Sequence, residues 1–407
     1  MTFSLPGKIA CLVMICLALL PAHGAGETAD YCTVPPFLQP YSGPDAAAIP
    51  QTVDSPRGFM LTGQVLSTQP GGKKIGVDAL AIAVEWGEED ENGYVDTKTV
   101  EAMTDKCGFF SVAVNRQTAK HNVKVIAKTV NGKVRVQTNA GSVHSWVLFD
   151  GKVTATSLDL GDYAVTGTTG NLALMIHTHI TRAWRWLYRF SNYYIEMEQL
   201  RVDFPSSGNE LHWNRLELES VPYDSTNQEK LHEMMMRFYA HYFLREHSAL
   251  PSYSCGGETP CLPLFCATTE QTALVAGFSQ WVLASVEQHW EDNYGRSFIA
   301  DPTYTVPPLE QPAVYDTCNG GQNPETSPGR LAALLWDLAD EDPNPSASEP
   351  DEITIAGIVL LDIFKQFSPE TPAEFVDALI QQAGIVNRDA LRTVVEEAGF
   401  TWTEPQP

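Results

Sequence analysis

Residues 161–190 read GDYAVTGTTGNLALMIHTHITRAWRWLYRF, and the hydrophobic period changes inside this stretch, near Gly167. Upstream of Gly167, apolar and polar residues alternate with period two, which is typical of strands. Downstream, six apolar residues recur at helical spacing, namely Leu172, Ile176, Ile180, Ala183, Trp184 and Leu187. The stretch therefore predicts an α+β protein of two domains, in which a strand-rich part ends near residue 166 and a helical part follows.

Upstream of this switch, short alternating segments are separated by glycine, asparagine and aspartate turns such as Asn131-Gly132. This pattern predicts a β-sandwich over residues 58–166. The segments expected to form its strands are Met60–Leu66, Val77–Trp86, Phe109–Val114, Val123–Ala127 and Val134–Gln137.

Downstream of the switch, the spacing predicts a mainly α-helical domain over residues 167–407. The expected helices are Leu172–Phe190, Glu229–His247, Thr268–Tyr294, Pro328–Ala339, Ile353–Phe367, Pro372–Ala383 and Arg388–Ala398. The first of them carries Arg182, Arg185 and Arg189 among aromatic residues. We expect a partly buried helix whose arginines extend to solvent; the alternative is a basic surface for a nucleic acid or a membrane.

The N-terminal residues 1–24 are expected to form a cleavable signal peptide. An apolar run after Lys8 is too short to span a bilayer comfortably, and small residues precede Ala25. An uncleaved membrane anchor is the alternative. Residues 25–57 are rich in proline, glycine and small polar residues, which predicts an extended lead-in. No later segment is apolar enough to span a membrane, and we expect a secreted or periplasmic protein.

The composition restricts the partners of this chain. Its 407 residues include 26 basic and 50 acidic side chains, which gives a net charge of −24. Proteins that track phosphates need a basic face, so nucleic acid is not expected as a partner. The 43% of hydrophobic residues excludes a largely disordered chain. The expected partner is a protein or a glycan of unknown identity.

Eight cysteines are present, and Cys11 and Cys16 lie in the predicted signal peptide. An even number of cysteines outside the cytoplasm favours disulfides, and their spacing does not match a zinc ribbon. The connectivity stays open among the six remaining candidates, which are Cys32, Cys107, Cys255, Cys261, Cys266 and Cys318.

A turn of the first half carries a family resemblance. The sequence TDKCGFF at residues 104–110, with GQV at residues 63–65 and AVEW at residues 83–86, resembles the transthyretin-like or carboxypeptidase-regulatory-like β-sandwich of secreted proteins. The resemblance implies a module for stability or targeting, without catalytic chemistry.

The second half carries three ordered motifs: RFYAHY at residues 237–242, AGFS at residues 276–279 and LWDLAD at residues 335–340. They resemble the motifs H-E-[YF]-[GA]-H, E-G-[FW]-A and L-W-D-L of secreted bacterial zinc metallopeptidase-like (gluzincin-like) proteins. The resemblance covers about half of the chain, roughly residues 171–367, and implies a metallopeptidase-like helical domain.

The departures from these motifs decide the predicted function. In H-E-x-x-H, two histidines on one helical face bind Zn²⁺ and the glutamate activates water. In this chain Arg237 replaces the first histidine, Phe238 replaces the general base and Ala276 replaces the third ligand, so only His241 is retained. A guanidinium cannot coordinate a cation. We therefore expect a vestigial site with no catalytic residue, no metal and no cofactor, and a binding or structural role.

Two alternatives stay open. A relocated metal site could use His232, Glu233, His241 and Glu270 in an active hydrolase, although Glu233 and Arg237 are spaced for an ion pair along the helix. Alternatively, the β-sandwich could act as an adhesion or carbohydrate-binding module.

Two further patterns suggest metal sites only weakly. His177 and His179 would face different sides of a helix, and we expect two separate histidines. The acidic stretch from Asp337 to Glu352 is expected to be a solvated loop, and a calcium site there is the alternative.

Overall fold

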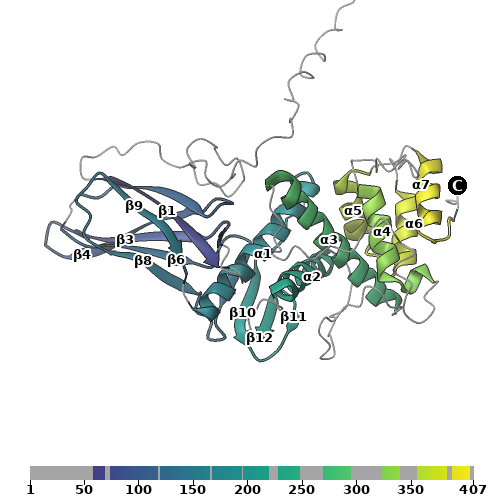
Figure 1. Cartoon of the computed structure of the whole chain (residues 1–407), viewed down its shortest axis with the longest axis horizontal. Helices are drawn as coiled ribbons and strands as arrows, with labels where there is room; N and C mark the ends of the chain where they lie inside the picture. Colours follow the sequence, from purple (N-terminus) through teal and green to yellow (C-terminus); the bar gives the residue numbers. More distant parts are fainter. Residues whose placement is uncertain are drawn as a thin grey trace, which may run out of the picture.

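A computed structural model describes residues 58–68, 74–117, 120–165, 167–194, 196–219, 228–247, 269–294, 323–339, 355–382 and 387–403. Its class is α+β, with a strand-rich N-terminal part and a helical C-terminal part (Figure 1). The predicted signal peptide, the lead-in and most of the acidic stretch after Asp337 lie outside the described residues.

Two four-stranded sheets, here called sheets A and B, form the strand-rich part. In sheet A, β1 pairs antiparallel with β2 and β5 and parallel with β9. In sheet B, the strand order is β4-β3-β6-β8, with antiparallel pairs throughout. The bounds are β1 Phe59–Thr68, β2 Lys74–Gly76, β3 Ala81–Glu89, β4 Val95–Met103, β5 Phe109–Val114, β6 Val123–Lys128, β8 Ser145–Gly151 and β9 Ser157–Ala164.

Buried residues of both sheets form one hydrophobic cluster, which includes Phe59, Leu61, Val84 and Val125. Alternation along the strands explains this packing, because every second side chain of β1 and β6 points into the cluster. Buried side chains of the two sheets therefore lie in one cluster, and β3 begins at Ala81, four residues after the predicted start at Val77.

The TDKCGFF segment makes the turn between β4 and β5. The Asp105 carboxylate accepts hydrogen bonds from the backbone N–H groups of Cys107 and Phe109. Gly108 has φ of 82°, and a Cβ there would lie 2.2 Å from the Val65 carbonyl oxygen, so only glycine fits.

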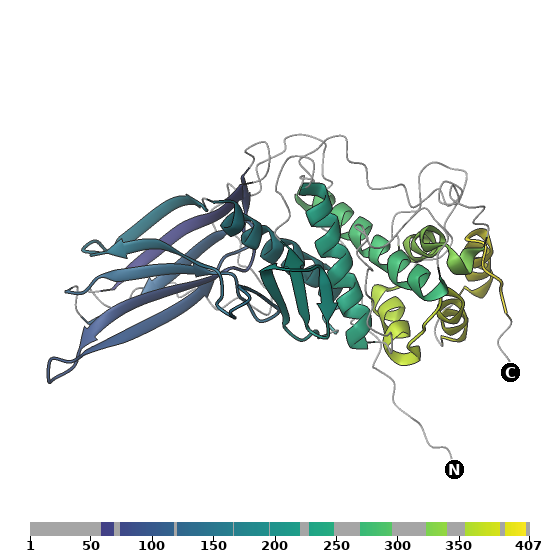
Figure 2. The same ribbon diagram turned by 90° about the horizontal axis from the view of Figure 1, so that it is seen from below.

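A third sheet adds strands that the sequence did not predict to the mainly helical second half. Sheet C has the order β11-β12-β10-β7, and its strand β7 comes from the predicted β-sandwich region. Their bounds are β7 Val134–Gln137, β10 Leu200–Ser206, β11 Glu210–His212 and β12 Arg215–Glu219. Figure 2 shows this small sheet between the two larger sheets and helix α2. The boundary between residues 166 and 167 stays a prediction, and β7 pairs with β10 across it.

Helices α1 to α3 follow the predicted spacing closely, with α1 at Thr168–Phe190, α2 at Gln228–His247 and α3 at Glu270–Tyr294. The remaining helices are α4 Pro328–Ala339, α5 Gly357–Phe367, α6 Pro372–Gln381 and α7 Arg388–Glu397, with a short 3₁₀ helix at Pro324–Thr326. No helix in the described ranges is long and apolar enough to cross a membrane.

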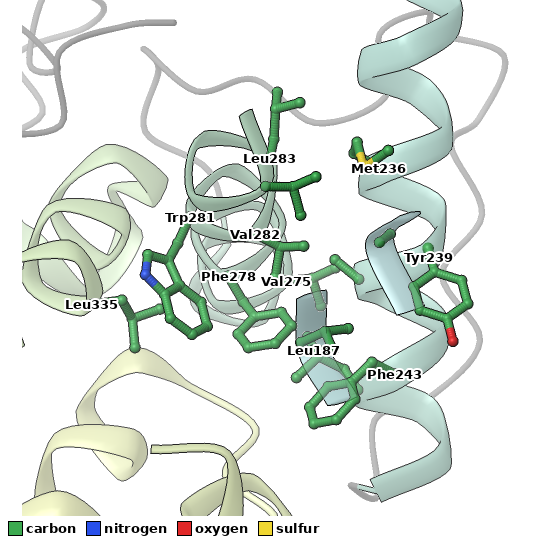
Figure 3. Close-up of a cluster of buried hydrophobic side chains, with 14 of the residues drawn as sticks. Leu187, Met236, Tyr239, Phe243, Val275, Phe278, Trp281, Val282, Leu283 and Leu335 are labelled. Carbon is green, nitrogen blue, oxygen red and sulfur yellow. The ribbon is translucent and has the colours of Figure 1, made fainter. Parts of the chain in front are cut away.

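The helices share a hydrophobic core with the inner face of sheet C. Phe278 of α3 lies at its centre, and its ring centroid is 5.5 Å from that of Phe243 on α2 (Figure 3). The ring centroid of Phe364 on α5 is 4.8 Å away. Trp281 continues this aromatic stack towards Trp186 of α1. The second and third helices are therefore held by packing that includes α1 and α5.

Candidate functional site

Helices α2 and α3 carry all four residues of the predicted vestigial site. The contacts His232–Glu287, Arg237–Gln280 and Phe243–Phe278 show that the two helices run antiparallel. Ala276 lies one turn before Gln280, and His241 lies one turn after Arg237. Ala276 therefore lies at the level of His241, inside a packed helix interface.

Arg237 is buried in this interface and is held by two side chains. Its Nη2 atom forms an ion pair with Glu233, one turn earlier on α2, and donates a hydrogen bond to Gln280 Oε1 at 2.9 Å. The Ser279 hydroxyl donates to the Arg237 carbonyl oxygen. The ion pair predicted between Glu233 and Arg237 is confirmed, and it fixes a permanent positive charge beside α3.

His241 and Phe238 complete the predicted set without adding charge. Burial and the nearby Arg245 charge lower the pKa of His241 to about 4, so its imidazole is neutral at pH 7. Phe238 is partly buried and packs against the helical core. Ala276 is fully buried. The four residues therefore share one interface, in which Arg237 supplies the only charge among them.

His232 points to a different set of partners. Its Nε2 atom contacts Glu287 of α3, and its Nδ1 atom shares a hydrogen bond of 2.9 Å with Nδ1 of His179 on α1. Burial, followed by the His232 and Arg182 charges, lowers the pKa of His179 well below its usual value. We call His179, His232 and Glu287 the histidine chain. It joins α1, α2 and α3 in the protein interior through one hydrogen bond, between the two histidines, and one ion-pair contact, between His232 and Glu287.

The histidine chain does not have the geometry of a metal centre. His232 uses opposite ring nitrogens for its two contacts, so the three groups do not converge on one point. Over the residues that the structure describes, no group of three or more His, Cys, Asp or Glu side chains could hold a metal ion.

The four residues considered for a relocated site are not brought together. His232 contacts Glu287, whereas Glu270 is exposed at the start of α3, 17 residues earlier and therefore about 25 Å away along the helix. His232 and His241 are separated by nine residues, or about 13 Å of helical rise.

Two arginines of α1 differ from the expectation that they extend to solvent. Arg182 and Arg185 are buried. Arg185 contacts the buried Asp78 carboxylate through Nε at 2.8 Å and Nη2 at 3.1 Å. Burial raises the pKa of Asp78 to about 7, whereas the Arg182 charge and the contact with Arg185 favour the carboxylate. The expectation was wrong because an acidic turn residue 107 positions away meets α1.

His177 and His179 have separate surroundings, as their helical spacing predicts. His177 Nε2 lies 3.1 Å from the Ala79 carbonyl oxygen, near the side chain of Asn131. Burial lowers the pKa of His177 to about 4. Its contacts tie α1 to the turn before β3, while His179 ties α1 to α2.

Sequence reasoning missed the partnership of His179, His232 and Glu287. The residues come from three helices, and no local spacing relates positions 179 and 232. The only available signal was the presence of polar side chains on strongly apolar helical segments, which requires buried partners.

Cys107 forms a disulfide bond. The other five candidates, Cys32, Cys255, Cys261, Cys266 and Cys318, lie outside the described residues.

Comparisons with known proteins give no family for this chain. No protein family matches the sequence, and no curated protein matches it. Part of the chain is similar to the solved structure of the major plantain pollen allergen Pla l 1, with 12% sequence identity over 26% of this chain and 91% of the allergen. The TM-score is 0.17, too low to support an argument about fold or function.

Proposed function

We propose that this chain is a secreted or periplasmic protein with a binding or structural role and without peptidase activity. Its strand-rich part is proposed to be a transthyretin-like β-sandwich, and its helices a metallopeptidase-like domain with a vestigial zinc site. The disulfide at Cys107 supports an oxidising compartment, since disulfides are rare in the cytosol.

The observation that carries the proposal is the environment of Arg237. Its guanidinium occupies the position that the resemblance assigns to a zinc-binding histidine, and Glu233 and Gln280 hold it there. A fixed cation repels a second cation and offers no lone pair for coordination. Phe238, at the position of the general base, cannot accept a proton.

The experiment compares the native chain with a variant that restores the motif, R237H/F238E/A276E. The native protein is expected to show no chelator-sensitive peptide cleavage. The variant is expected to gain affinity for zinc, because an imidazole at position 237 and a carboxylate at position 276 would then lie close to His241. A packing control, R237Q/F238L/A276S, removes the same groups without adding these ligands and should not bind zinc.

Each outcome of this comparison has a definite meaning. Chelator-sensitive cleavage by the native chain would overturn the absence of peptidase activity. A restored variant that melts at the same temperature as the packing control, but binds zinc no better, would show that the assigned motif register is wrong.

A further inference from the structure

The outer face of sheet C, opposite the helical core, carries two parallel rows of polar side chains. The strand register places His212 opposite Arg215, Arg215 opposite Arg201, and Arg201 opposite Arg135. Directly paired residues point to the same side of a sheet. Because neighbouring strands are about 4.8 Å apart, this basic row spans about 14 Å across all four strands.

The adjacent row is acidic. It contains Glu210, Glu217 and Asp203, followed by Gln137, again in direct register across the four strands. Asp203 is buried beneath its neighbours, while Glu210 is exposed and Glu217 is partly exposed. The face therefore offers guanidinium donors next to carboxylate acceptors.

Most members of the basic row already have a protein partner. Arg215 pairs with Asp203 and, at 3.1 Å, with Glu217. Arg135 donates to Gln137 Oε1 at 2.8 Å and to the Gly141 carbonyl oxygen. Arg201 differs: its side chain is exposed and forms no hydrogen bond or ion pair with the part of the chain that the structure describes.

Arg201 lies between two arginines and has no carboxylate partner of its own among the described residues. Like charges directly opposite each other in a sheet repel, and Arg201 has an arginine on each side. An anion bound at Arg201 would relieve this repulsion, and the planar guanidinium fork matches the geometry of a carboxylate or a sulfate.

We propose that the outer face of sheet C binds a saccharide that carries carboxylate or sulfate groups, with one such group bound by Arg201. Glu210 and Glu217, the accessible carboxylates of the acidic row, then accept hydrogen bonds from the sugar hydroxyls, which are donors as well as acceptors. Trp213, 62% exposed in the turn between β11 and β12, lies directly next to His212 and provides an aromatic surface for a sugar ring.

The Trp213 ring has a defined position. The Arg245 guanidinium of α2 lies 6.0 Å from the ring centroid, and Arg245 also donates to the Leu211 carbonyl oxygen at 2.8 Å. The indole therefore lies beside α2, at the β11 edge of sheet C.

The same face is poorly suited to other polyanions. A membrane of anionic lipids or a nucleic acid would bring closely spaced negative charges against Glu210, Glu217 and Glu219. Repulsion from distant charges is screened beyond about 8 Å at physiological salt. A saccharide with spaced anionic groups therefore fits the two rows better.

The test measures calorimetric binding of the full mature chain at about 0.15 M salt. The probes are trigalacturonic acid, which carries carboxylates, a heparin-derived tetrasaccharide, which carries sulfates, and neutral maltotetraose. We expect at least one acidic probe to bind more tightly than maltotetraose. R201Q should weaken that binding about tenfold, because a charge-assisted hydrogen bond is lost.

Matched controls separate a local site from general charge. R388Q removes another exposed arginine, on α7, and should leave the affinity for the acidic probe unchanged. W213A should weaken the binding of that probe. Its control is Y94A, which removes an exposed aromatic ring at the β3–β4 turn. Thermal melting of each variant checks that the fold is retained.

Three results would overturn the proposal. The first is that neither acidic probe binds more tightly than maltotetraose, and the second is that R201Q and R388Q weaken binding equally. The third is that phosphatidylglycerol vesicles or polyglutamate bind as tightly as the acidic saccharide and depend on Arg201 in the same way. The inference adds a ligand class to the binding role proposed above but rests on sheet C alone. It therefore fails or holds independently of the zinc experiment on α2 and α3.

Discussion

At the scale of single residues, buried charges in this protein are held by partners that lie far away in sequence. Asp78 and Arg185 are the clearest example. Above about pH 8, where a carboxyl with a pKa of about 7 is ionised, we expect D78N to lower the free energy of unfolding by about 3–5 kcal/mol, because it leaves the Arg185 charge buried without a carboxylate. Chemical denaturation measures this change.

The control for D78N is D96N, on the exposed strand β4. Asp96 is 69% exposed and lies 3.7 Å from Lys98, so this substitution should change stability by less than about 1 kcal/mol. An equally small effect of D78N would mean that Asp78 is neutral in the folded protein and that the ion pair does not form.

Buried histidines predict a loss of stability in acid. Burial holds the pKa of His177 near 4, while an unfolded histidine takes up its proton near pH 6.5. Between these values the unfolded chain binds more protons, so stability falls as the pH is lowered. The full contribution of His177 is about 3 kcal/mol at pH 4.

The variant H177Q isolates this effect. The difference in unfolding free energy between native protein and H177Q should shrink by about that amount from pH 7 to pH 4, as measured by urea denaturation. A difference that is independent of pH would show that His177 is not buried as a neutral group.

At the scale of helices and strands, the spacing of apolar residues along the sequence predicted most helices and several strands. The helix at Pro328–Ala339 and the strand at Phe109–Val114 have the predicted bounds. Strands β10 to β12 were not predicted. Of these, β10 pairs with β7, whose residues lie more than 60 positions earlier, and β12 and β11 join the sheet through β10. Period alone cannot supply such long-range contacts.

In the candidate site, too, local spacing predicts contacts within one helix but not contacts between helices. The ion pair between Glu233 and Arg237 follows from helical spacing and was predictable. The contact between Arg237 and Gln280 requires the antiparallel packing of α2 on α3, which no local pattern specifies. The charged rows on sheet C depend in the same way on the register between strands.

Helix packing gives a prediction for Phe278, which contacts aromatic rings of α2 and α5. F278A should lower the free energy of unfolding by about 3–5 kcal/mol, since it removes a fully buried ring. F367A, at an exposed position of α5, should cost clearly less. Equal effects of the two variants would contradict the central position of Phe278.

Strand pairing in sheet C gives a prediction of opposite sign. R201T should raise the unfolding free energy of the ligand-free protein by up to about 1 kcal/mol, because it removes the repulsion from Arg135 and Arg215 and introduces a residue that favours strands. A decrease in stability would show that Arg201 has a stabilising partner in the folded chain.

At the scale of the whole molecule, three kinds of contact join the two parts of the chain. The strand pair β7–β10, the ion pair of Asp78 with Arg185, and the contacts of His177 all cross the predicted boundary. We expect the two parts to unfold in one calorimetric transition. Two well-separated transitions would mean that these contacts contribute little to stability.

The account of the whole protein depends most on the absence of a zinc centre at α2 and α3. The most direct measurement is the metal content of the native mature chain after equilibration with zinc and gel filtration, combined with a peptidase assay with and without chelator. The buried Arg237 cation predicts no stoichiometric zinc and no chelator-sensitive cleavage. One equivalent of retained zinc with cleavage that a chelator abolishes would contradict the account.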